Sequence, residues 1–347
     1  MKRRDFLKSA VAAAAATAVP AFAYPKGKVK FCAFADIHFN PGVWPHGEIA
    51  FLDRILARAQ SEKTDFTVQL GDFTHRVDRQ EELDYIKRYN TFGQQAYHVL
   101  GNHDGERGEG GYRAAMDAYG MKSNCYSFDV NGWRFLVGDP NYFLLDGRYV
   151  HYEGRNLQSA AKTGRVESVC CIPPEQVDWI MGTVRESPYP CVFMSHESVE
   201  RPGAVSNGTE IRRLFDEINR ETPGKVRLVI NGHHHCDHVR VMNDIVYLDL
   251  NSASYMYFAK RHDRYPREYV KKVAGAANAI IWNDPLSAIV TLDGSSIKIA
   301  GSSSTYYLGV TPQMAGYGSL DGAGRPIVPF VSSFEFTKST PKPARTG

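Results

Sequence analysis

The sequence predicts an α/β fold, and three observations support this prediction. Short apolar runs rich in β-branched and aromatic residues, typical of buried strands, recur along the chain. Between them lie longer segments with apolar residues at helical spacing and polar residues elsewhere. No internal repeat and no convincing linker divides the chain, so we expect one large domain spanning residues 24–310.

The first half of the chain alternates strands with helices. The expected strands are 29–35, 66–70 and 96–100. Amphipathic patterns predict the intervening helices at 49–59, 79–89 and 112–119. A hairpin of strands 126–130 and 133–137 should follow, because Asn131-Gly132 is a strong signal for a tight turn.

The second half continues the alternation after a long interruption. Residues 140–172 show no period, and loops of this length are usually functional or mobile. Beyond them the expected helices are 174–184 and 211–218, and the expected strands are 191–195, 226–230, 245–250, 288–292 and 296–300. Residues 311–347 are rich in Gly, Pro and Ser, which predicts an irregular C-terminal tail.

Residues 1–23 have the pattern of an export signal. The basic start contains the pair Arg3-Arg4, an alanine-rich run follows, and Ala21-Phe22-Ala23 fits a signal peptidase site. The paired arginines resemble a twin-arginine signal. An uncleaved anchor is the alternative, but a membrane span needs about 20 apolar residues, and this run is shorter. We therefore expect a cleaved signal, no stable membrane anchor, and export to the periplasm or the extracellular space.

The charge balance argues against nucleic acid as a partner. The chain has 41 Lys and Arg against 38 Asp and Glu, and removal of residues 1–23 leaves 37 of each. A mature chain without excess base gives no electrostatic reason to expect nucleic-acid binding. The six cysteines show no C-x-x-C spacing, and the twin-arginine route exports folded proteins, so we expect no essential disulfide. The sequence predicts no particular oligomeric state.

Polar side chains follow five of the expected strands at the point where each ends. In chain order they are Asp36 and His38, Asp72, Asn102 and His103, His196, and finally His233 and His235. Parallel strands bring their carboxyl ends to one edge, where α/β proteins bind ligands. Each residue alone would be interpreted as a turn cap or a hydrogen-bonded turn residue. Five strand ends of this chemistry in one chain predict one shared site.

The residue types in this set favour a metal site. Imidazole with carboxylate and amide oxygen suits Mn, Fe, Zn, Ni or Co, and the absence of thiolate argues against a closed structural zinc site. Seven candidate ligands are too many for one open ion. Two ions about 3.5–4 Å apart that share a carboxylate accommodate them, as in two-metal displacement at phosphorus. We therefore expect two divalent transition-metal ions.

The ordered motifs resemble those of the calcineurin-like metallophosphoesterase superfamily. They are Asp36-x-His38, Gly71-Asp72, Gly101-Asn102-His103-Asp104, His196 and Gly232-His233-x-His235. The resemblance implies a four-layer α/β/β/α sandwich of two mixed sheets. It implies one ion held by Asp36, His38 and His235, and a second held by Asn102, His196 and His233. Asp72 would bridge the two ions.

The resemblance also implies catalytic roles. A hydroxide bound between the two ions would be the nucleophile, its pKa lowered by the two cations. His103 would be the general acid that protonates the leaving alkoxide, and Asp104 would orient its ring. Asn102 is neutral, which keeps the site cationic toward a phosphate anion.

Several residues near the motifs receive other interpretations. Purple acid phosphatases carry a tyrosine ligand where this chain has His75, so no purple colour is expected. We interpret His75 as a helix-start residue, with a hydrogen bond to a ligand as the alternative. The Ser/Thr phosphatase pattern is also absent, and strand alternation turns His234 away from the site. Candidate phosphate contacts in the 140–172 segment are Arg148, Arg155, Lys162 and Arg165.

These observations predict an exported metallophosphoesterase, that is, a hydrolase of phosphoric ester bonds. The expected substrate is a small phosphomonoester or phosphodiester. One alternative is a phosphodiesterase specific for cyclic nucleotides or glycerophosphodiesters. A non-catalytic metal- or phosphate-binding protein is the alternative from another class, and the presence of His103 argues against it. A nuclease role is disfavoured by the neutral mature charge and by the export signal.

Overall fold

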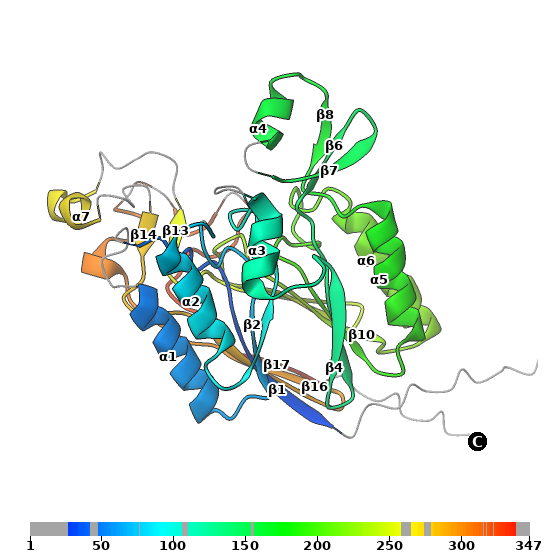
Figure 1. Cartoon of the computed structure of the whole chain (residues 1–347). Coiled ribbons are helices and arrows are strands. Elements are labelled where there is room, and N and C mark those ends of the chain that lie inside the picture. The colour runs from blue at the N-terminus through cyan, green and yellow to red at the C-terminus, as the bar shows by residue number, and fades with distance from the viewer. Residues whose placement is uncertain are drawn as a thin grey trace, which may run out of the picture.

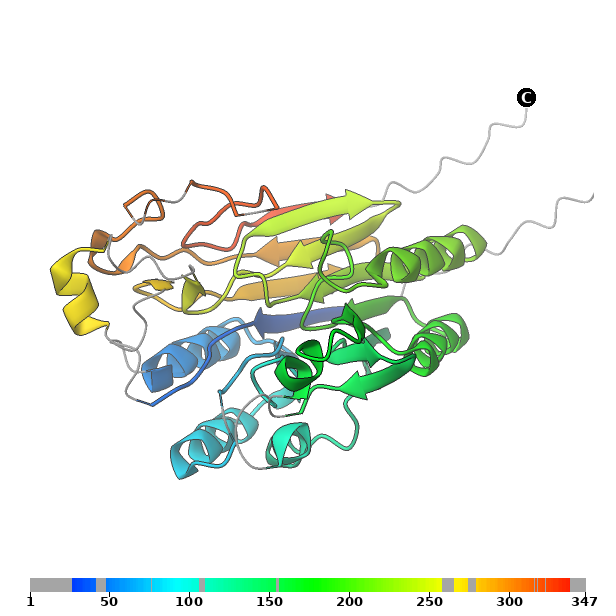
Figure 2. The ribbon, with the colours of Figure 1, turned by 90° about the horizontal axis from the view of Figure 1, so that it is seen from above.

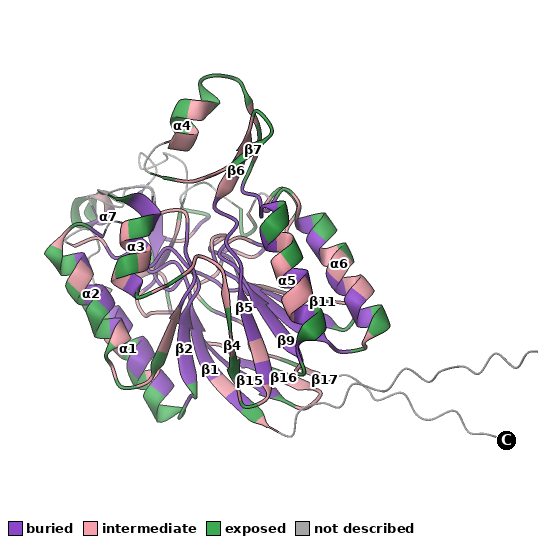
Figure 3. Ribbon diagram, turned by 45° about the vertical axis from the view of Figure 1, so that its right-hand side comes forward, coloured by how far each residue is buried: buried purple, intermediate pink, exposed green. Residues whose placement is uncertain are grey.

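Four layers of secondary structure make up the body of the molecule. The computed structural model describes residues 27–41, 48–75, 77–105, 110–153, 156–257, 265–273, 279–314, 316, 318–321 and 323–337. Two six-stranded mixed sheets lie face to face, and helices cover the outer face of each (Figures 1 and 3). This arrangement is the expected α/β/β/α sandwich of two mixed sheets.

The first sheet brings three strand ends to one edge. Its order is β17 (Phe334–Thr337), β16 (Ser296–Ala300), β15 (Ala288–Asp293), β1 (Lys28–Phe34), β2 (Phe66–Gln69) and β3 (Gln95–His98). β2 is parallel to both β1 and β3, and the other pairs are antiparallel. The segments after β1, β2 and β3 therefore leave the sheet at the same edge.

The second sheet also brings the ends of its central strands to one edge. Its order is β11 (His238–Met242), β12 (Ile245–Asp249), β10 (Val226–Asn231), β9 (Cys191–Met194), β5 (Trp133–Val137) and β4 (Tyr126–Val130). β9 is parallel to β5 and β10, and β10 is parallel to β12. The chain therefore leaves β9 and β10 at one edge as well.

Strand alternation in β1 shows how the layers are held together. Phe31 belongs to the core between the sheets, where it stacks on Phe66 at a centroid distance of 4.9 Å. Its neighbours Cys32 and Phe34 point to the opposite face, which is covered by helices. These helices are α1 (Glu48–Ser61), α2 (Gln80–Asn90) and α3 (Gly111–Tyr119). On the second sheet the corresponding helices are α5 (Pro174–Glu186) and α6 (Gly208–Glu221).

The segment 140–172, expected to lack regular structure, folds into a small sheet. It contains β6 (Tyr142–Leu145), β7 (Arg148–His151), α4 (Asn156–Ala161) and β8 (Val166–Val169), with strand order β7-β6-β8. Figure 1 shows this unit projecting beyond one end of the two large sheets. The prediction was wrong because each strand has only four residues and most of its side chains are exposed or half-buried, so no long apolar period develops.

Two further strands, β13 (Tyr255–Tyr257) and β14 (Ala279–Ile281), pair antiparallel, and the short helix α7 (Arg267–Lys272) lies between them in the sequence. In the view from above (Figure 2), this yellow pair of strands and the green β7-β6-β8 sheet lie at different places on the same end of the sandwich. Both units border the edge at which the strands named above end. The expected site is therefore flanked by two accessory elements.

The described part of the expected irregular tail packs on the body of the protein. Besides the strand β17, it includes Arg325, which pairs with Glu200 at 2.5 Å and with Asp249. Ser332 donates from its amide to Asp237, two residues after His235, at 2.9 Å. This segment thus braces the chain that follows β10.

The predicted signal lies outside the described residues. Within the described ranges, none of the helices has the length and apolar character required to cross a bilayer.

Candidate metal centre

The seven predicted ligands lie on turns that directly follow strands. Asp36 and His38 follow β1, Asp72 follows β2, Asn102 follows β3, His196 follows β9, and His233 and His235 follow β10. Backbone hydrogen bonds connect the turns: the Asp36 amide donates to Gly71 O at 3.0 Å, and the His38 amide donates to Asp72 O at 2.9 Å. The structure therefore brings together the residues that the sequence separates by 200 positions.

Five of the seven ligands adopt the left-handed backbone conformation, with φ between 47° and 66°. They are Asp36, His38, Asp72, His233 and His235. This conformation costs a non-glycine residue on the order of 1 kcal/mol or more, and such costs concentrate at functional sites. The turns therefore sacrifice stability in order to direct these side chains to one point.

Two glycines in the motifs are required by close contacts. A Cβ atom on Gly101 would lie 2.2 Å from the Asp72 amide nitrogen and from its Oδ1. A Cβ on Gly232 would lie 2.7 Å from Asp36 Oδ2. Gly101 allows the turns after β2 and β3 of the first sheet to approach each other, and Gly232 does the same for the turns after β1 and β10 of the two sheets.

One group of ligands consists of Asp36, His38 and His235. The Nε2 atoms of His38 and His235 are 3.3 Å apart, and Asp36 Oδ1 lies 3.3 Å from His235 Nε2 and 3.8 Å from His38 Nε2. All three side chains are buried. One ion could contact all three atoms.

A second group gathers around His196. Its Nε2 atom lies 3.2 Å from Asn102 Oδ1, 3.1 Å from His233 Nδ1 and 3.2 Å from Asp72 Oδ2. The same Asp72 oxygen is 3.6 Å from His38 Nε2, which belongs to the first group. Asp72 therefore occupies the position between the two groups that a bridging carboxylate requires.

The donor set fits cations. His196 Nδ1 lies 2.8 Å from Leu70 O, and His235 Nδ1 lies 2.7 Å from Tyr255 O. A ring nitrogen that faces a carbonyl must carry the proton, so in the neutral ring the opposite nitrogen presents a lone pair to the centre. Asp36 Oδ1 is buried without a hydrogen-bond donor among the described residues. Converging lone pairs and carboxylates are stable together when positive charge lies between them.

The electrostatics of Asp72 and His196 show the same demand for positive charge. Burial alone would lower the pKa of His196, but the adjacent Asp72 and Asp36 raise it to about 10. Burial would raise the pKa of Asp72, yet the surrounding imidazoles hold it well below its usual range. Both shifts have the same cause, which is the close approach of carboxylates and imidazoles at one buried point.

His103 lies on the open side of the centre. Its ring is 5.1 Å from the His38 ring between centroids, and its amide donates to Asp72 Oδ1 at 2.7 Å. A pocket of about 130 Å³ lies over the ligands and is lined by His103 together with Met256 and Tyr257 of β13. A group bound there would meet both the ligand cluster and the His103 ring.

Asp104 joins two turns of the first sheet. Its Oδ1 accepts from the amides of Phe73 and Thr74 and from the Tyr119 hydroxyl, and its Oδ2 accepts from the amides of Asp72 and Gly101. Asp104 therefore ties the Asp72 turn to the Gly101 turn, and its role in orienting the His103 ring stays a prediction. Burial raises the pKa of the Asp104 carboxyl to about 6, and the nearby negative charge of Asp72 contributes to this shift.

His75 does not begin a helix, because α2 starts at Gln80. Its ring is buried and lies 4.9 Å from the ring of His38 and 5.0 Å from that of His103, between centroids. His234 belongs to neither ligand group, but it lines the pocket over them and is not turned away from the site as expected; its Nε2 lies 3.4 Å from the Ser198 amide nitrogen. His75 is thus a neighbour of the reacting groups that the sequence interpretation underestimated.

The candidate phosphate contacts lie away from the ligands. Arg148, Lys162 and Arg165 are exposed on the small β7-β6-β8 sheet and its connections, and Arg165 pairs with Asp146 at 2.6 Å. None of the three lines the pocket over the ligands. Arg155 lies outside the described residues.

Sequence reasoning missed Glu197, which directly follows His196. Its Oε1 lies 2.7 Å from His233 Nε2. A glutamate beside a histidine has no distinguishing pattern, because the contact depends on how β9 and β10 lie next to each other.

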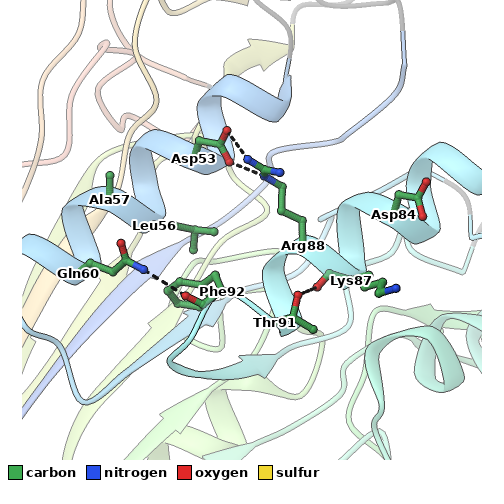
Figure 4. A pocket seen from close by; sticks show the side chains of 9 residues that line it. All are labelled: Asp53, Leu56, Ala57, Gln60, Asp84, Lys87, Arg88, Thr91 and Phe92. Carbon is green, nitrogen blue, oxygen red and sulfur yellow. Dashed lines mark hydrogen bonds and ion pairs between the residues drawn. The ribbon is translucent and has the colours of Figure 1, made fainter.

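A larger hollow lies elsewhere, between α1 and α2 (Figure 4). Its volume is about 560 Å³, and Arg88 crosses it to pair with Asp53 through hydrogen bonds of 2.5 and 2.7 Å. None of the ligand groups described above lines it. The strand-end cluster is therefore the candidate site.

Comparisons with known proteins agree with this geometry. Residues 29–237, more than half of the chain, match the family model described as calcineurin-like phosphoesterase, and residues 1–20 match the model of the twin-arginine translocation signal. No curated protein matches the chain.

Two solved structures share the fold. A dimetal phosphatase from Danio rerio is 14% identical with a TM-score of 0.54, covering 91% of this chain and 100% of its own. GAP50, the anchor in the inner membrane complex of Plasmodium, is 11% identical with a TM-score of 0.51, covering 91% of both chains. At these identities the likeness shows the fold alone.

Proposed function

The chain belongs to the calcineurin-like phosphoesterase family, and we propose that it is an exported hydrolase of small phosphomonoesters or phosphodiesters that uses two divalent transition-metal ions. One observation carries the proposal. Asp72 Oδ2 lies 3.6 Å from His38 Nε2 and 3.2 Å from His196 Nε2, between two groups of ligands. This is the arrangement that a two-metal site needs.

The residues divide the work of binding. Asp36, His38 and His235 would hold one ion, and Asn102, His196 and His233 the other, with Asp72 shared. When bound, the two ions would supply Lewis-acid chemistry by activating water and stabilising charge on the phosphoryl group. Only two of the seven ligands are carboxylates, so the loaded centre keeps a net positive charge that attracts a phosphate anion.

His103 would act on the leaving group. The hydrogen bond that its backbone amide donates to Asp72 Oδ1 fixes its position relative to the bridging carboxylate. Its ring faces the pocket over the ligands. An imidazolium there could donate a proton to the departing alkoxide, a contribution of about 10²- to 10⁴-fold in rate. A protein that only bound metal or phosphate would have no need for this residue.

The twin-arginine signal supports an exported location, either periplasmic or extracellular. The pocket of about 130 Å³ is small and opens to solvent, which supports a small ester as substrate. The site's chemistry is common to monoesters and diesters, including cyclic nucleotides and glycerophosphodiesters.

Metal analysis and turnover of the purified mature protein test the proposal. Protein reconstituted with Mn, Fe, Zn, Ni or Co is expected to bind two ions per chain and to hydrolyse an aryl phosphate monoester, an aryl phosphate diester, or both. Asp72→Asn should reduce turnover by about a thousandfold or more, because several kcal/mol of transition-state stabilisation depend on the paired ions. Unchanged turnover in this variant would refute the mechanism. Two bound ions without hydrolysis of any ester would favour the non-catalytic alternative.

A further inference from the structure

The carboxylate of Glu197 lies behind one of the candidate metal ligands. Glu197 follows β9, and its Oε1 is 2.7 Å from His233 Nε2. We propose that Glu197 is a positioning residue for His233, which directs the Nδ1 lone pair of that ring to the second ion and strengthens the binding of this ion alone. The inference rests on the two-metal site proposed above.

The geometry of the His233 ring supports this role. Its Nδ1 lies 3.1 Å from His196 Nε2, at the centre of the second ligand group, and its Nε2 faces Glu197 on the opposite side. An ionised carboxylate can only accept a hydrogen bond, so the proton of a neutral His233 must be on Nε2. The lone pair is then on Nδ1, as a metal ligand requires. Carboxylates behind ligating histidines fix the ring in this way and increase its basicity.

The contact is sheltered from solvent. The Glu197 side chain is 14% exposed, and its Oε2 is buried without a hydrogen-bond partner among the described residues. The Ser195 hydroxyl donates to the Glu197 carbonyl at 2.7 Å and so holds the turn that carries the side chain. A largely buried carboxylate with an unsatisfied oxygen is costly unless positive charge lies nearby. A cation on His233 would provide that charge.

The charge distribution explains why only one ion needs this support. The first group has a carboxylate of its own, Asp36, whereas the second has the neutral Asn102 and shares Asp72. In two other ligands, His196 and His235, the ring nitrogen that points away from the centre faces a neutral backbone carbonyl. These carbonyls belong to Leu70 and Tyr255. Glu197 therefore supplies, from behind His233, the negative charge that the second group lacks.

Metal titration of the metal-free protein tests the proposal. Titration with Mn²⁺, followed by electron paramagnetic resonance, separates a single bound ion from a pair coupled through a shared carboxylate. In Glu197→Gln, which keeps the size of the side chain but removes its charge, the second ion should bind about 10- to 100-fold more weakly and the first ion unchanged. Glu197→Ala should produce at least the same loss. Glu210→Gln, at an exposed position on α6, is the matched control and should titrate like wild type.

The outcomes distinguish this inference from its premise. If both ions bind Glu197→Gln as tightly as wild type, or if both weaken equally, Glu197 does not position His233. If wild-type protein itself never forms the coupled pair, the two-metal site fails, and this inference fails with it. Because the glutamine variant keeps the shape of the turn, its unfolding without metal should match wild type, and a large loss there would assign Glu197 a structural role instead.

Discussion

The two sheets contribute unlike groups to the metal centre. The first sheet supplies both carboxylates, the amide, the His38 imidazole and the candidate acid, carried on the turns after β1, β2 and β3. The second sheet supplies three imidazoles, His196, His233 and His235, on the turns after β9 and β10. Both anionic ligands thus come from the first sheet, whereas the second sheet contributes only ring nitrogens.

The two halves are also held in place differently. The first is fixed by backbone amides, since Asp104 accepts from the turns at Asp72 and Gly101, and Asp72 itself accepts from the His103 amide. In the second half, ring nitrogens are oriented by single hydrogen bonds to a carbonyl or a carboxylate. Damage to the first half should therefore reach the fold, whereas damage to the second should be confined to metal binding.

Two adjacent residues of the first half give the largest expected effects. Asp104→Asn places an amide group against buried backbone donors, and we expect a loss of about 2–4 kcal/mol in the free energy of unfolding. His103→Asn should leave that free energy within about 1 kcal/mol and lower turnover by about 10²- to 10⁴-fold. Urea denaturation and steady-state kinetics measure the two quantities. A catalytic defect without destabilisation in Asp104→Asn would instead support the predicted role of Asp104 in orienting the His103 ring.

The parts of the site that sequence could predict are those that depend on residue type after a strand. Asp36, Asp72 and His196 follow apolar runs, and parallel strands bring such positions to one edge. The roles of Asp104 and Glu197 could not be predicted in this way. Each role depends on which neighbouring turn or strand the side chain reaches. Tertiary contacts set that direction, and it leaves no local pattern in the sequence.

The accessory elements escaped prediction for a related reason. β17 contains four residues of alternating exposure, and its place beside β16 depends on a chain that returns from the far end of the molecule. The small β7-β6-β8 sheet has strands too short to show a period. Long strands with buried faces, such as β1 and β10, were predicted because their composition is dictated by the core.

Removing one imidazole from the second half should have an intermediate effect. His196→Ala takes away the ring around which Asn102, His233 and Asp72 gather, so one of the two ions should be lost, with a loss of affinity above the roughly 10- to 100-fold typical of an outer partner. Metal analysis after dialysis is expected to give one ion per chain instead of two. Loss of both ions would show that the two groups are not separable.

The smallest effect concerns an imidazole of the first sheet that is not a ligand. His98 of β3 is buried. Its Nε2 lies 2.7 Å from Asn90 Oδ1, and its Nδ1 lies 3.2 Å from the side-chain nitrogen Nε2 of Gln69. Burial lowers its pKa to about 3. Below about pH 6.5 the unfolded chain binds a proton here that the folded chain does not, so stability falls as the pH falls toward 3.

The variant His98→Gln isolates this contribution. Between pH 7 and pH 5.5, metal-free wild type should lose about 1 kcal/mol more of its unfolding free energy than the variant does. Urea titrations at the two pH values measure the difference, and the other histidines cancel because both proteins contain them. Equal losses would mean that His98 takes up a proton in the folded state. The contrast between the sheets would then be weaker, since imidazoles on both sides would gain positive charge in the absence of metal.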